Sequence, residues 1–129
     1  MKYLTFFGFM SLCIFFIYRM FATSTDDHSL EHILAKDPII IDVRTPEEYK
    51  MGHINGSLNI SLAELEKGTP LSLDLKCPIL TCCSHGVRSI QAVKILVNRG
   101  YQNASNGGAW TNLQMLMDKY HHSKVSDIK

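Results

Sequence analysis

The chain has 129 residues, a formal net charge of +1, 46% hydrophobic residues and 19% charged residues. About 100 residues remain after an apolar N-terminus, which is enough for one compact domain and not for two. Nucleic-acid binding needs clustered Lys and Arg, and no basic block is present, so we expect no nucleic-acid partner. The cysteines are too few for a disulfide scaffold and form no CxxC pair, which disfavours a zinc ribbon or a dithiol redox pair. They are Cys13, Cys77, Cys82 and Cys83.

The N-terminal segment is apolar. Residues 3–18 carry no charge and are rich in Phe, Leu and Ile, with Lys2 before them and Arg19 after them. A membrane span needs about 20 residues, a length that residues 20–22 complete if the Arg19 side chain extends to the membrane surface. We expect residues 1–22 to be an uncleaved transmembrane anchor or a cleaved signal peptide, with a buried core helix as a third alternative. The first two place the domain at the cell membrane or, after export, in the periplasm.

Short strands and helices are predicted to alternate after a polar linker at residues 23–28. Residues 39–43 are largely apolar and β-branched, as in a strand buried on both faces of a parallel sheet. Thr45 followed by Pro46 and two acids is typical of a helix start. Ser61 with a Glu three residues later predicts a second helix start. The expected elements are a helix over 29–35, a strand over 39–43, a helix from 45 to about 52, a strand near 57–59 and a helix over 62–67.

The second half continues the alternation. Residues 78–82 predict another buried strand, and residues 89–98 a helix with apolar residues at helical spacing. We also expect a short strand over 103–105, a turn at Asn106-Gly107-Gly108 and a last helix over 110–121. Strands that alternate with helices predict an α/β fold with a parallel sheet. We assign this domain to residues 29–122 and a C-terminal tail to residues 123–129.

Cys83 stands where a strand is predicted to end and a helix to follow. Parallel α/β sheets bind ligands outside the carboxyl ends of their strands, and a helix N-terminus stabilises anions and lowers the pKa of a cysteine. Arg88 adds a positive charge that can bind an oxyanion, and Gly86 lets the backbone turn inward. This combination suits a nucleophile that attacks a sulfane sulfur and holds the resulting persulfide. A lone cysteine at a strand end is more often buried packing.

Three stretches of the sequence resemble the single-domain rhodanese (thiosulfate sulfurtransferase-like) family. They are IDVRTPEEY with GHINGSLNI at residues 41–49 and 52–60, CSHGVRS at 83–89, and NGGAW at 106–110. The resemblance implies a rhodanese-like three-layer α/β sandwich around a central parallel sheet, here preceded by an N-terminal hydrophobic helix. It also implies that Cys83 carries a persulfide during turnover. A small exported or anchored form is similar to the phage-shock-type periplasmic rhodaneses.

The resemblance assigns roles to particular residues. Cys83 would be the catalytic nucleophile. Asp42 and Arg44 would form a structural ion pair that supports the loop, although an ordinary strand-end pair is the alternative. Cys82 is expected to point away from Cys83 into the core, with a role as resolving thiol as the alternative. The residues that would bind substrate are Ser84, His85, Gly86, Val87, Arg88 and Ser89.

The length of the loop separates the candidate activities. Four residues lie between Cys83 and Arg88, whereas related cell-cycle phosphatases and arsenate reductases carry five, which makes room for a tetrahedral phosphate or arsenate. We therefore expect a sulfurtransferase that moves sulfur from a small anion such as thiosulfate, or from a persulfide, to a thiol or protein acceptor. We expect no metal and no organic cofactor. A non-enzymatic persulfide carrier and, less favoured, a phosphatase or arsenate reductase are the alternatives.

Overall fold

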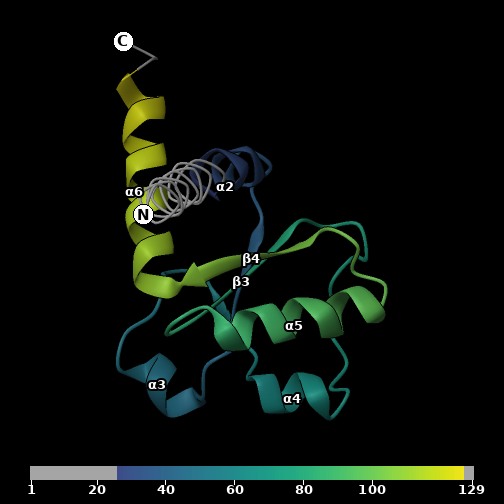
Figure 1. Cartoon of the computed structure of the whole chain (residues 1–129). Coiled ribbons are helices and arrows are strands. Elements are labelled where there is room, and N and C mark those ends of the chain that lie inside the picture. Colours follow the sequence, from purple (N-terminus) through teal and green to yellow (C-terminus); the bar gives the residue numbers. More distant parts are fainter. Residues whose placement is uncertain (1–25, 127–129) are drawn as a thin grey trace, which may run out of the picture. The chain divides into compact units, whose positions relative to one another are not determined.

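The computed structural model describes residues 26–126. The chain divides into two compact units after Leu30, and the second unit contains the sheet. Its helices and strands alternate along the chain as the sequence predicts (Figure 1). The elements are α2 (Asp26–Leu34), which runs across the division, β1 (Ile39–Asp42), α3 (Pro46–Lys50), β2 (Leu58–Asn59), α4 (Leu62–Glu66), β3 (Ile79–Cys83), α5 (Val87–Asn98), β4 (Ala104–Ala109) and α6 (Trp110–Ser126).

The four strands form one parallel sheet in the order β2-β1-β3-β4. The register pairs Asp42 of β1 with Cys82 of β3, so both strands end at the same edge of the sheet. That edge is where an open parallel α/β sheet binds its ligand. The predicted α/β fold with a central parallel sheet is therefore confirmed.

Local sequence chemistry accounts for the starts of two helices. Thr45 caps α3: its side chain accepts a hydrogen bond from the backbone N–H of Glu48, and the Glu48 carboxylate accepts one from the backbone of Thr45. Ser61 and Glu64 form the same reciprocal capping box at α4. Each box satisfies N–H groups that the first helical turn leaves without partners. Both predicted starts are confirmed.

Several boundaries differ from the predicted ones. The turn expected at Asn106-Gly107-Gly108 is wrong, because these residues continue β4 along β3 through the pairing of Cys83 with Ala109. A register shift between Thr81 and Cys83 accommodates this pairing. The strand β3 ends at Cys83 instead of residue 82, and α5 begins at residue 87 instead of 89. Helix α2 begins in the expected linker, and α6 continues to residue 126 instead of ending at 121.

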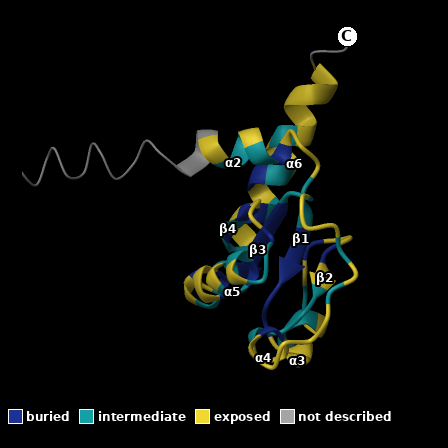
Figure 2. Cartoon of the chain, turned by 90° about the vertical axis from the view of Figure 1, so that its right-hand side faces the viewer, coloured by how far each residue is buried: buried dark blue, intermediate teal, exposed yellow. Residues whose placement is uncertain are grey.

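The core lies between the sheet and its helices (Figure 2). Helix α5 packs on β3 and β4, α4 packs against α5, and α6 contacts β4 and β3. Every residue of β3 is buried, as expected for an inner strand of a parallel sheet covered by helices. The largest side chains of the hydrophobic core cluster are those of Ile41, Leu65, Ile79, Leu96 and Tyr101.

Within residues 26–126, no helix combines the length and the apolar character that crossing a lipid bilayer requires. The anchor or signal peptide expected at residues 1–22 lies outside the described residues, as do residues 23–25 of the expected linker and residues 127–129 of the expected tail.

Candidate active site

Cys83 is the last residue of β3, and its side chain is buried. Three residues later, Gly86 takes a left-handed conformation with φ of 90° and caps the N-terminus of α5. Residues with a Cβ rarely adopt this conformation. The turn brings the Gly86 N–H to 3.0 Å from the Cys83 sulfur, to which it donates a hydrogen bond. Cys83 therefore faces the positive end of a helix, as the sequence predicts.

The surroundings of Cys83 favour its thiolate. Burial by itself raises the pKa of this thiol, but hydrogen bonds from the backbone N–H groups of Ser89, His85 and Gly86 and from the Ser89 hydroxyl outweigh it and lower the pKa below the ordinary value. Burial, with Asp42 nearby, raises the pKa of the neighbouring Cys82 to about 12. Cys82 is fully buried, as expected. Of the two adjacent thiols, Cys83 is the one suited to act as a nucleophile.

Ser89 connects the sulfur to β4. Its hydroxyl oxygen lies 3.7 Å from the Cys83 sulfur, 2.8 Å from the Gly86 carbonyl oxygen and 2.6 Å from Oδ1 of Asn106. That Oδ1 also accepts a hydrogen bond from the Gly108 N–H. A hydroxyl has one proton to donate, so the thiolate and the two oxygens share one donor. The sequence pattern placed Asn106 in a turn and predicted no role for it at the site.

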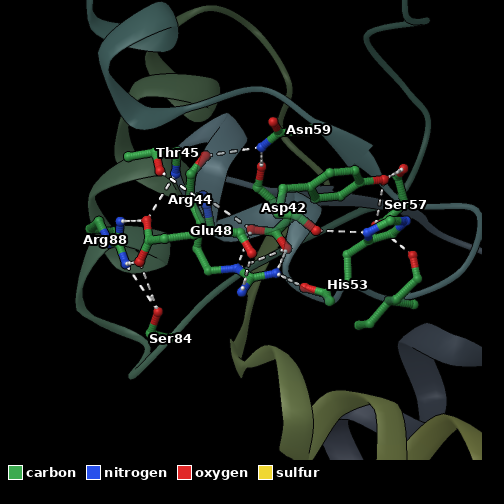
Figure 3. Close-up of polar contacts among 12 residues, drawn as sticks. Asp42, Arg44, Thr45, Glu48, His53, Ser57, Asn59, Ser84 and Arg88 are labelled. Atoms are coloured by element: carbon green, nitrogen blue, oxygen red, sulfur yellow. Dashed lines mark hydrogen bonds and ion pairs between the residues drawn. The ribbon is translucent and has the colours of Figure 1, made fainter.

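Arg88 forms a two-pronged ion pair with Glu48 (Figure 3). Its two terminal nitrogens lie 2.7 Å and 2.8 Å from the two carboxylate oxygens, and one of them also donates to the Ser84 hydroxyl at 3.1 Å. The hydrogen bond from Arg88, together with that from the Thr45 backbone, lowers the pKa of Glu48 to about 2. The guanidinium predicted to bind an oxyanion is thus already bound to a carboxylate. The sequence placed Glu48 among the acids of a first helical turn but contained no signal that it pairs with Arg88.

The expected ion pair between Asp42 and Arg44 is present and buried, with 2.6 Å between the closest charged atoms. Arg44 also donates to the carbonyl oxygens of Gly52 at 2.7 Å and Glu48 at 3.4 Å, and its guanidinium lies over the Trp110 ring at 4.8 Å. The pair therefore joins the end of β1 to α3 and to the start of α6. It reaches the Cys83 loop through α3, whose Glu48 binds Arg88.

The remaining loop residues that were assigned to substrate binding differ in exposure. The side chains of His85 and Val87 are exposed, and that of Ser84 is half-buried and donates to Glu48 at 3.3 Å. Cys83, Gly86 and Ser89 are buried beneath them. The loop therefore presents backbone N–H groups around a buried sulfur and places its one guanidinium at the rim. Within the described residues, no cluster of three or more His, Cys, Asp or Glu could hold a metal ion.

Comparison with known proteins agrees with this geometry. Residues 26–113 match the family model of the rhodanese-like domain. Thiosulfate sulfurtransferase PspE of Escherichia coli is 34% identical over 76 residues, which cover 58% of this chain and 73% of that protein. Thiosulfate sulfurtransferase GlpE of Pseudoalteromonas translucida is 34% identical over 86 residues, which cover 64% of this chain and 81% of that protein. The structure of the human single-domain sulfurtransferase TSTD1 is similar, with a TM-score of 0.57, 29% identity and coverage of 68% of this chain and 89% of that one. The chain is a rhodanese-like enzyme and belongs to the rhodanese-like domain family.

Proposed function

We propose that this protein is a sulfurtransferase in which Cys83 accepts a sulfane sulfur from thiosulfate or from a persulfide and passes it to a thiol or protein acceptor. The observation that carries the proposal is the position of the Cys83 sulfur. It is buried at the N-terminus of α5, accepts the Gly86 N–H at 3.0 Å and has a lowered pKa. Sulfur transfer is also supported by the similarity to PspE and GlpE, both of which are named thiosulfate sulfurtransferases.

The transfer has two steps. The Cys83 thiolate attacks the outer sulfur of thiosulfate, a bond forms between the two sulfurs, and sulfite leaves with the electron pair of the broken S–S bond. An acceptor such as cyanide or a thiolate then attacks the outer sulfur of the persulfide and restores the Cys83 thiolate. The persulfide is an anion, and the N–H groups that lower the thiol pKa are placed to stabilise it as well. Neither step requires a metal or an organic cofactor.

Mass spectrometry of the Cys83 peptide after treatment with thiosulfate tests the first step. We expect a gain of one sulfur atom, which a Cys83→Ser variant lacks and a Cys82→Ser variant retains. A wild-type protein that gains no sulfur at Cys83 from thiosulfate or from a persulfide would contradict the proposal.

Turnover separates enzyme from carrier. We expect steady-state formation of thiocyanate from thiosulfate and cyanide that depends on Cys83. Persulfide formation without turnover would favour the alternative, a carrier that delivers sulfur to one docked partner. Cys83-dependent hydrolysis of an aryl phosphate would favour a phosphatase, which the loop of four intervening residues disfavours.

The proposal extends to localisation. The uncharged apolar run at residues 3–18 supports a role for residues 1–22 in taking the domain to the cell membrane or across it. Cell fractionation, with the N-terminus of the recovered protein determined by mass spectrometry, tests this. An intact N-terminus gives membrane-bound protein, and a cleaved one gives exported protein. Full-length protein in the cytosolic fraction would contradict the proposal.

A further inference from the structure

The carboxylate of Glu48 is held on Arg88 by more than the ion pair. Besides the two hydrogen bonds from Arg88, its Oε2 accepts the Thr45 backbone N–H at 3.0 Å and its Oε1 accepts the Ser84 hydroxyl at 3.3 Å. The first contact belongs to the capping box of α3, and the second comes from the Cys83 loop. Contacts from the start of α3 and from the Cys83 loop therefore hold the Glu48 carboxylate in place beside Arg88 (Figure 3).

The ion pair leaves the mouth of the site without net positive charge. Arg88 is the only Lys or Arg within the loop at residues 83–89, and Glu48 cancels its charge. Both side chains are about one-third exposed, at 34% for Arg88 and 36% for Glu48, so an incoming donor meets them together. Once Cys83 is a thiolate, the side chains of Cys83, Arg88 and Glu48 together carry a net negative charge. Because Coulomb energy is proportional to the donor's charge, a dianion is disfavoured twice as strongly as a monoanion.

We propose that Glu48 determines donor specificity. By neutralising Arg88 it directs the site toward sulfane-sulfur donors with less negative charge than thiosulfate, namely thiosulfonates and organic persulfides. This inference rests on the sulfur-transfer function proposed above. With a thiosulfonate, the Cys83 thiolate attacks the outer sulfur, the S–S bond breaks, and a sulfinate leaves with the electron pair. The products are again a Cys83 persulfide and a stable anion.

A Glu48→Gln variant tests the proposal with two donors of related chemistry, thiosulfate with two negative charges and methanethiosulfonate with one. Cyanide serves as the acceptor for both at fixed ionic strength. We expect kcat/KM for thiosulfate to rise about 10-fold and kcat/KM for methanethiosulfonate to rise about 3-fold. The logarithm of the rise for thiosulfate is then twice that for methanethiosulfonate, as expected when Coulomb energy is proportional to the donor's charge. Glu47→Gln is the matched control, because Glu47 lies on the same helix and is exposed. Because water and salt screen the charge of an exposed carboxylate, removing it should change kcat/KM for either donor by less than about twofold.

Equal changes for the two donors, or a fall in both, would overturn the proposal, since a distorted loop affects every donor alike. The thermal unfolding midpoint and the rate of Cys83 alkylation show whether the variant keeps its fold and its loop. The failure of the underlying function has a different signature. In that case neither the wild-type protein nor the Glu48→Gln variant forms a Cys83 persulfide with either donor.

Discussion

The hydroxyl oxygen of Ser89 lies 2.6 Å from Oδ1 of Asn106 and 3.7 Å from the sulfur of Cys83. One side chain thus contacts both the nucleophile and the Gly-rich strand β4. The contact matters because the Ser89 hydroxyl is among the groups that lower the pKa of Cys83.

Replacing Ser89 by Ala should raise the pKa of Cys83 and so reduce its thiolate fraction at neutral pH. We expect the rate of alkylation by iodoacetamide at pH 7 to fall roughly threefold to tenfold, since an internal hydrogen bond is worth about 1 kcal/mol. The pH dependence of alkylation checks this, and at high pH, where both proteins are thiolates, the rates should converge. Cys82→Ser is the control, because its thiol is fully buried. An unchanged pH profile for Ser89→Ala would show that the backbone N–H groups alone set the pKa.

The two ion pairs near the site should differ sharply in their contribution to stability. Asp42→Asn leaves the buried Arg44 without a counter-charge, and breaking a buried pair in this way costs about 3–5 kcal/mol. Glu48→Gln breaks the part-exposed pair with Arg88, for which we expect less than about 1 kcal/mol. Urea unfolding monitored by circular dichroism measures both free energies of unfolding. Equal losses in the two variants would contradict the assignment of Asp42 and Arg44 as the structural pair.

The contribution of Glu48 to stability should depend on pH. Arg88 and the Thr45 backbone lower its pKa from 4.5 to about 2, so the folded state binds this proton less readily than the unfolded state. The stabilisation is therefore fully present above pH 4.5 and is lost as the pH falls toward 2. The difference in unfolding free energy between wild type and Glu48→Gln should shrink over that interval. A difference that stays constant from neutral pH down to pH 2 would argue against the ion pair as its source.

Gly107 has no room for a Cβ atom, so any side chain there should destabilise the fold. A Cβ built there would lie 2.8 Å from Cδ2 of Leu113 and 3.0 Å from the Thr81 carbonyl oxygen. One contact is with the packed start of α6 and the other with β3. We expect Gly107→Ala to lower the free energy of unfolding by about 1–3 kcal/mol, the usual cost of overpacking a core. In the double variant Gly107→Ala with Leu113→Val, the smaller side chain should relieve part of this overpacking. Its loss of unfolding free energy should therefore be smaller than the sum of the two single losses, whereas a loss equal to that sum would show that the Leu113 contact is not the cause.

The features that the sequence predicted correctly depend on neighbours along the chain. Thr45 and Ser61 cap helices through residues three positions away. The placement of Cys83 depends on a strand, a glycine and a helix within a few residues. These patterns act locally, so composition and spacing suffice to predict them.

The features that the sequence missed depend on partners far along the chain. Glu48 binds a side chain 40 positions away, and Asn106 binds Ser89 at a separation of 17. The run Asn106-Gly107-Gly108 has the composition of a turn, but pairing with β3 makes it part of a strand. The lack of room for a Cβ at Gly107 accounts for the glycine at that position. Such outcomes depend on the register of the sheet, which local preference does not determine.

Cys82 and Cys83 are chemically identical neighbours, and their different reactivities follow from the pairing of β3. Because side chains alternate along a strand, a slip of one residue against β1 would turn the Cys83 side chain to the opposite face of the sheet, away from the loop. Such a molecule would keep every helix and strand yet present its loop without a reactive sulfur. An assay of secondary structure could not tell it from the native protein, whereas counting the thiols that react with an electrophile would. Correct strand alignment is thus a condition for catalysis as much as for stability.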